Sequence, residues 1–378
     1  VDRSRGLGDV YKRQHPLWFA DAPGTEDTNG FARQNWFEPV GREAAMLRDA
    51  VGVIDISNFG KYEVKGPGAG DWLDALVANH VPREIGKSCL TPLIGMRGGV
   101  AGDFTITMTG DESYMMIGSG MAERYHRRFF DMVPLPDGTG FEVATPRIAG
   151  FNVAGPRSRE MLASLTEADL SNEGWRFMRS RRIAVGGVDC LAIRVSFTGD
   201  LGWELHCAVD DQVALYEILL EAAAAHGGGP VGGRALGALR IEKGYGSWGR
   251  EYSPEYWPQE AGLHGLIKLD KDFLNKEAYL KISNTPPRES LTMFEVDVAD
   301  NADANGGEPI FLADGTPVGR VTSGSYGYTV GKSLAIGYAR EGVVHAGDKV
   351  EIFILGKPHA ATVLDKPPFD AGGERLRA

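Results

Sequence analysis

The stretch FTGDLGWELHC, residues 197–207, is the part of the sequence from which the rest of the chain can be interpreted. Gly199 and Gly202 enclose an Asp-Leu pair, and glycine adopts backbone angles that other residues resist. The apolar run LAIRVS precedes them, so the pattern predicts a strand, a tight turn and a second strand. Glu204 comes after the turn, beside the large aromatic ring of Trp203.

Glu204 has two interpretations. A carboxylate accepts two parallel N–H bonds, so an acid beside a tryptophan at the mouth of a hairpin can hold a planar nitrogen heterocycle. Exposed acids are the norm in proteins, and on that view Glu204 is a solvated strand residue. The stretch by itself favours the solvated residue.

The composition indicates a multidomain protein and excludes several functions. A chain of 378 residues with 43% hydrophobic residues is long and apolar enough for two or three domains. The net charge of −11 argues against non-specific nucleic-acid binding, which needs a basic surface. No apolar run reaches the length of a membrane helix, so no membrane partner is expected.

The cysteines and short motifs indicate neither a metal site nor a nucleotide site. Cys89, Cys190 and Cys207 are too scattered for a disulfide framework or a zinc site, and they fit a reducing, cytoplasmic location. The eight histidines form no HExxH motif, so we expect no metal. The GxGxxG between Gly227 and Gly232 comes after a helix and contains a proline, which argues against a dinucleotide site.

The composition of the sequence changes at two places, and a repeated pattern lies between them. Residues 1–14, VDRSRGLGDVYKRQ, do not fit the rest of the chain, and we interpret them as an adaptor-derived tail of a truncated protein. KYEVKGPGAGDWLDAL and RIAGFNVAGPRSREMLASL each indicate a strand, a Gly-Pro turn and a helix, as in a weak duplication. After the linker NTPPRES, short strands divided by Gly and Pro predict a separate β-barrel-like domain.

Five segments in the expected order resemble the glycine cleavage T-protein (aminomethyltransferase) superfamily. NWFEPVGRE and EKGYGSWGREYSPEYWPQEAGL further resemble the folate-binding half of dimethylglycine and sarcosine dehydrogenases. The five segments are RGGVAGDFTITM, FTGDLGWELHC, LRIEKG, EAGL and GRVTSGSYGYTVGKSLAIGYAR.

The resemblance implies an α+β, three-domain cloverleaf. A folate-binding core, residues 15–284, would consist of two interleaved ferredoxin-like lobes, followed by a β-barrel over residues 285–378. Lobe one would cover about 36–62 and 146–253, and lobe two about 63–145 and 254–284.

The resemblance also implies a set of site residues. Asp103 would be the catalytic acid that faces the folate nitrogen, although Gly102 stands where the family has a first acid. Glu204 would bind the pterin edge, and Arg240 a ligand carboxylate. Asp103 is otherwise a turn residue, and Arg240 a surface partner for an acid. The cofactor-binding set is completed by Phe197, in place of the family's tyrosine, and by Trp203, Tyr245 and Trp248.

The function implied is capture of the one-carbon unit from N-methyl amine oxidation as 5,10-methylenetetrahydrofolate. Tetrahydrofolate would be the cofactor, and FAD would belong only to an upstream flavin domain absent from this chain. Three alternatives stay open: a stand-alone aminomethyltransferase acting on a lipoyl carrier, a folate-dependent demethylase, and a non-catalytic folate-binding module.

Overall fold

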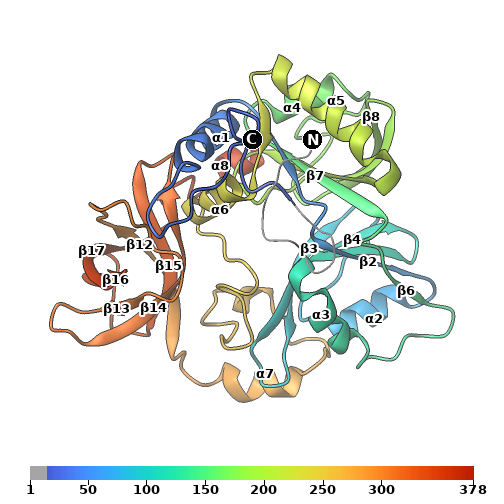
Figure 1. The fold of residues 1–378 in the computed structure, drawn as a ribbon. Helices are drawn as coiled ribbons and strands as arrows, with labels where there is room; N and C mark the ends of the chain where they lie inside the picture. Colours follow the sequence, from blue (N-terminus) through green and yellow to red (C-terminus); the bar gives the residue numbers. More distant parts are fainter. Residues whose placement is uncertain (1–14) are drawn as a thin grey trace.

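Two β-sheets and a β-barrel surround a common centre in the computed structural model, which describes residues 15–378 (Figure 1). Residues 1–14, which we interpret as an adaptor-derived tail, lie outside the described residues. Helices cover the sheets, and a closed barrel of six strands ends the fold. The predicted α+β class and the C-terminal barrel are therefore confirmed.

The first sheet has six strands in the order β11-β1-β7-β10-β9-β8. Helices α4 and α5 cover one face, where Trp175 and Trp203 are buried in the core, while α1 and α6 cover part of the other face. We call this unit lobe one. Its elements are α1 (Phe37–Asp49), β1 (Gly52–Asp55), β7 (Ile148–Ala154), α4 (Ser158–Ala163), β8 (Ser180–Val185), β9 (Val188–Ile193), β10 (Gly202–Ala208), α5 (Gln212–Ala225), β11 (Gly229–Val231) and α6 (Gly233–Glu242).

The second sheet has five strands in the order β3-β4-β5-β2-β6 and forms lobe two. Helices α2 and α3 pack on one face through Trp72, Leu73, Phe129 and Phe130. Helix α7 (Lys276–Ser283) lies beyond it in the chain. The elements are β2 (Gly60–Lys65), α2 (Ala69–Leu76), β3 (Ser88–Ile94), β4 (Val100–Gly110), β5 (Ser113–Gly118), α3 (Glu123–Phe130) and β6 (Gly140–Val143).

The two lobes are interleaved because the chain leaves the first sheet after β1, builds the second, and returns at β7. Both β2–α2 and β7–α4 connect a strand to a helix through a Gly-Pro turn. Gly66 and Gly155 take left-handed φ angles of 118° and 130° at these turns. The duplicated turn chemistry therefore has matching backbone geometry. The exact lobe boundaries stay a prediction.

The barrel closes because β12 pairs with both β15 and β17. Its interior is filled by aliphatic residues and Phe294. Helix α8 (Glu374–Arg377) comes after the barrel and returns to lobe one (Figure 1). The barrel strands are β12 (Glu289–Val296), β13 (Pro309–Phe311), β14 (Pro317–Gly327), β15 (Lys332–Arg340), β16 (Lys349–Ile354) and β17 (Lys357–Leu364).

The stretch around residues 197–207 forms two antiparallel strands, as predicted, but without a tight turn. Strand β9 ends at Ile193 and β10 begins at Gly202, so residues 194–201 form a wide connection. Gly199 in this connection has a φ of 86°, in the left-handed region that glycine adopts without strain. The connection is wide because its polar groups are held by the distant helices α1 and α8.

Candidate functional site

The candidate site lies where the two sheets face each other. Met115 and Ile117 of β5 pack against Leu191 and Ile193 of β9. In a strand, every second side chain shares a face, and Glu204 of β10 is paired with Ile193. The side chain of Glu204 therefore points toward lobe two.

Asp103 points toward lobe one by the same argument. Thr105 of β4 pairs with Ile117, and Asp103 lies two residues before Thr105. Phe104 and Ile106, on the alternate face, belong to the core under α2 and α3. Asp103 and Glu204 thus come from different lobes and project into the same space between the sheets.

One carboxylate oxygen of Asp103 is unpaired among the described residues. Its Oδ1 atom is buried and accepts no hydrogen bond from the described residues. Burial raises the pKa of Asp103 to about 6, so the group exchanges a proton close to neutral pH. A β-bulge precedes it at Ala101, whose carbonyl accepts a hydrogen bond from the Trp248 indole at 3.1 Å. Such bulges re-aim neighbouring side chains.

The loop after α6 supplies aromatic walls. Tyr245 stacks on Phe197 with ring centroids 5.8 Å apart, and both side chains are half-buried. Trp248 packs edge-on against His126 of α3, 5.3 Å between centroids. Burial and the nearby Asp103 raise the pKa of Tyr252. This loop therefore contacts Phe197 through Tyr245 and lies near Asp103 through Tyr252.

Sequence reasoning missed Tyr252, which lies near Asp103. Its signal in the sequence was its place in the loop that also carries Tyr245 and Trp248.

Glu204 has polar neighbours that sequence reasoning also missed. Its side chain is 19% exposed, and His206 Nε2 lies 3.4 Å from its Oε2 atom. Asn152 of β7 is paired with Glu204 in the sheet, and the Oδ1 atom of Asn152 is buried without a partner among the described residues. The alternation of Glu204 and His206 in WELH was the available signal for His206.

Trp203 does not belong to this site. Consecutive strand residues point to opposite faces, and Trp203 is fully buried in the core of lobe one, with its ring 6.4 Å from that of Trp175. The expectation that Trp203 binds the cofactor is therefore wrong: the face opposite Glu204 is covered by α4 and α5.

Arg240 has an internal partner. Its guanidinium forms an ion pair with the buried Glu251 at 3.0 Å and donates to Ser323 Oγ at 2.8 Å. It also donates to the Tyr245 carbonyl. This arrangement rules out the surface-partner interpretation of Arg240, because the side chain is buried, while its binding of a ligand carboxylate stays a prediction. It connects α6, the aromatic loop and barrel strand β14.

A buried polar network anchors the 194–201 connection. Arg48 of α1 donates to the Thr198 carbonyl at 2.8 Å and forms ion pairs with Asp200 and, at 2.8 Å, with Glu242. Arg375 of α8 binds the other oxygen of Asp200 at 2.6 Å. The position of Phe197 and of the start of β10 therefore depends on helices α1 and α8, which lie far apart in the sequence.

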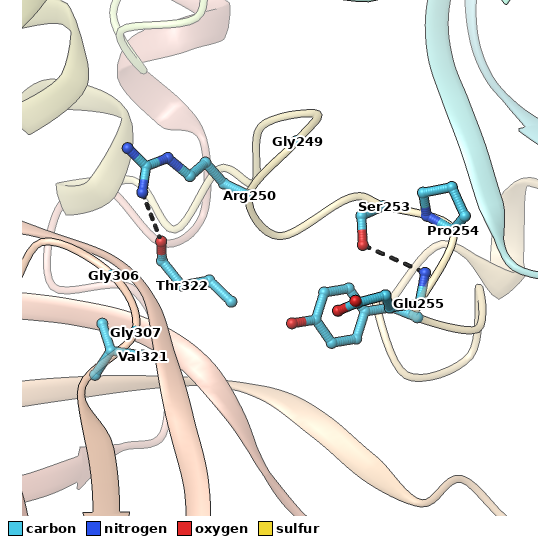
Figure 2. A pocket seen from close by; sticks show the side chains of 10 residues that line it. Gly249, Arg250, Ser253, Pro254, Glu255, Gly306, Gly307, Val321 and Thr322 are labelled. Atoms are coloured by element: carbon cyan, nitrogen blue, oxygen red, sulfur yellow. Dashed lines mark hydrogen bonds between the residues drawn. The ribbon is translucent and has the colours of Figure 1, made fainter. Parts of the chain in front are cut away.

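Two cavities border the barrel rather than the space between the sheets. One lies at the loop after α6, and the other among residues 27–36, helix α6 and the barrel. Figure 2 shows one of about 390 Å³, where Arg250 donates to the Thr322 carbonyl at 3.4 Å. The other, of about 450 Å³, is lined by Arg240 among the predicted site residues. Neither is lined by Asp103 or Glu204.

Residues 15–378 contain no group of three or more side chains placed to hold a metal ion. Among the helices of the same range, none has both the length and the apolar character needed to cross a bilayer.

Comparison with known proteins identifies the relatives of the chain. The GCVT N-terminal domain matches residues 5–271, beginning inside the segment interpreted as an adaptor-derived tail, and the glycine cleavage T-protein C-terminal barrel domain matches residues 290–370. The mitochondrial dimethylglycine dehydrogenase of Mus musculus is 36% identical over 94% of this chain. This chain spans only 41% of the mouse protein.

An aminomethyltransferase of Caldanaerobacter subterraneus subsp. tengcongensis is 29% identical, and the match covers 90% of both chains. The crystal structure of glycine cleavage system aminomethyltransferase T from Bartonella henselae matches the fold with a TM-score of 0.80. That match has 21% identity and covers 92% of this chain and 95% of the other. The resemblance and the fold that it implied are confirmed, and the chain belongs to the glycine cleavage T-protein family.

Proposed function

We propose that this chain binds tetrahydrofolate between its two lobes and captures a one-carbon unit on it. The observation that carries the proposal is the meeting of Asp103 and Glu204, from different sheets, beside the aromatic loop. Family membership supports it.

The unpaired acceptors of the site fit a ligand rich in N–H groups. Asp103 Oδ1 and Asn152 Oδ1 are buried without protein donors among the described residues, and unmet buried acceptors are costly. The Glu204 carboxylate can accept two parallel N–H bonds. The edge of a pterin presents such donors, and Phe197, Tyr245 and Trp248 offer apolar contact to its ring.

Each residue has a distinct task in this proposal. Bound tetrahydrofolate supplies the nitrogen nucleophiles for the one-carbon unit. Glu204 holds and orients the pterin edge. Asp103, ionised at neutral pH because its pKa is about 6, accepts a proton at Oδ1 or stabilises a nearby cation. Trp248 holds the bulge that aims Asp103, and the aromatic walls exclude water.

The one-carbon donor is the next part of the proposal. We infer an N-methyl amine oxidised by a flavin domain upstream, as the name of the mouse relative suggests. FAD would belong to that domain and not to this chain. A cytoplasmic location also stays a prediction, compatible with the free thiols of Cys89, Cys190 and Cys207.

The test is titration calorimetry of the chain with 5-formyltetrahydrofolate. Glu204→Gln replaces one acceptor with a donor that faces the pterin N–H, so we expect binding to weaken at least about tenfold. The melting temperature should change little, because a partly exposed acid is not core packing. Glu295→Gln on the barrel is the matched control. Unchanged affinity with a sharply lowered melting temperature would show that Glu204 is structural.

A stand-alone aminomethyltransferase is the second candidate, favoured by the match over 90% of both this chain and the Caldanaerobacter protein. That enzyme class would accept an aminomethyl-lipoyl carrier protein as donor. Transfer from such a carrier, without transfer from formaldehyde, would support the second candidate over the first.

A further inference from the structure

We propose that His206 positions the carboxylate of Glu204 for ligand binding. This inference rests on the proposed function and assigns a role to a buried imidazole. His206 does not touch the ligand in this proposal, because it is only 3% exposed, and it acts through Glu204.

The sheet places the two side chains together. Glu204 and His206 are alternate residues of β10 and therefore share the face toward lobe two. His206 Nε2 lies 3.4 Å from Glu204 Oε2. An N–H···O bond is usually 2.7–3.2 Å long, and contacts in ligand-free sites are often long and tighten in the complex. A small movement of the carboxylate closes this contact.

The ring of His206 is not engaged by any other hydrogen-bond partner among the described residues. Both ring nitrogens are buried and make no other hydrogen bond there. Gly150, paired with His206 on β7, leaves room for the ring, since a Cβ atom at position 150 would lie 2.9 Å from Nδ1. Leu191, paired with it on β9, is apolar. The carboxylate of Glu204, 3.4 Å from Nε2, is thus the acceptor that the ring meets along β10.

The imidazole is neutral in this environment. Burial lowers the pKa of His206, Glu204 opposes the shift and Lys61 adds to it. A neutral ring carries one N–H, and the carboxylate favours the tautomer with the proton on Nε2. His206 then donates to Oε2 and restricts the rotation of the carboxylate. The other lone pairs of Glu204 stay directed at the ligand without a full counter-charge that would compete for it.

The test is a double-mutant cycle measured by calorimetry with 5-formyltetrahydrofolate. His206→Leu removes the donor and should weaken binding about five- to tenfold, as expected for a lost hydrogen bond to a charged group. His206→Gln places an amide N–H near the position of Nε2 and should restore affinity to within about threefold of the wild type. In a Glu204→Ala background, His206→Leu should have no further effect, because the partner is gone.

Leu205→Ala is the matched control. It removes packing on the opposite face of β10, in the core under α4 and α5, so it should lower the melting temperature and leave affinity within about twofold. Melting curves of all variants separate effects on folding from effects on binding. If His206→Leu is too unstable to titrate, the affinity of His206→Gln decides the test.

Two results would overturn the inference. The first is wild-type affinity of His206→Leu together with weak binding by Glu204→Ala. The second is an effect of His206→Leu that persists in the Glu204→Ala background. Failure of the wild-type chain to bind 5-formyltetrahydrofolate would instead refute the proposed function, and the inference with it.

Discussion

At the scale of single residues, Asp103 combines burial, an unpaired oxygen and a raised pKa. Its carboxylate loses its proton as pH rises through about 6, so a base function should emerge over that range. We expect the rate of methylenetetrahydrofolate formation from formaldehyde, above the uncatalysed rate, to rise through pH 6. Asp103→Asn should retain 5-formyltetrahydrofolate binding, lose this pH dependence, and be slower by about a hundredfold. An unchanged pH profile in the variant would remove the role of Asp103.

Glu43 gives a second prediction at this scale. It is buried in α1 and accepts hydrogen bonds from the backbone N–H groups of Phe19 and Gly232, and burial raises its pKa to about 7 from 4.5. As pH rises, Glu43 loses its proton at a lower pH in the unfolded chain than in the folded chain. Folding stability should therefore fall as pH rises from about 4.5 to 7 and then level off. The total is on the order of 3 kcal/mol at most, at about 1.4 kcal/mol per pKa unit.

Urea unfolding at pH 5 and pH 8 tests this prediction with Glu43→Gln, which cannot ionise. The variant should gain stability relative to the wild type at the higher pH. Equal losses of unfolding free energy between pH 5 and pH 8 in the variant and the wild type would show that Glu43 does not titrate in this range.

At the scale of elements, strand β4 shows why a glycine precedes Asp103. A Cβ atom at Gly102 would lie 2.8 Å from Nε2 of His126 and 2.9 Å from the Phe104 ring, both in the core of lobe two. Gly102→Asp, which restores the acid pair of the family, should cost about 1–3 kcal/mol through overpacking. Adding His126→Ala to the Gly102→Asp variant should recover part of the lost stability. Equal stability of Gly102→Asp and the wild type in urea unfolding would contradict this account.

The connection before β10 depends on Arg48 of α1. Arg48→Met would leave Asp200 and Glu242 buried with one cation fewer, and uncompensated buried charge typically costs about 3–5 kcal/mol. Arg42→Met on the same helix is the control, since its pair with Asp21 is exposed and should contribute less than about 1 kcal/mol. Similar denaturation midpoints for the two variants would show that the network is not needed for stability.

At the scale of the whole molecule, Glu251 joins parts that are distant in the chain. It accepts hydrogen bonds from Arg240 of α6, the Ser247 backbone N–H, and Thr322 of the barrel. We expect the wild type to unfold in one calorimetric transition. Glu251→Ala leaves Arg240 without its acid, so the barrel should melt separately from the lobes. A single transition in the variant would indicate that other contacts hold the barrel.

The sequence by itself determined the class of the fold and its family. Both rest on patterns that involve residues close together in the chain, where local preferences act. These patterns are the duplicated strand, Gly-Pro turn and helix, the strand-rich C-terminal part and the five ordered segments. Asp103 and Glu204 could be singled out for the same reason, since each lies in such a segment.

Only the tertiary structure decided which candidates share a site. Strand alternation separates Trp203 from Glu204, but the packing of α4 and α5 decides that the face of Trp203 is the buried one. Arg240 is committed to Glu251, eleven positions away, and His206 lies in the sheet beside a glycine from another strand. Burial and pairing of polar groups depend on residues far apart in the sequence, so no local pattern could reveal them.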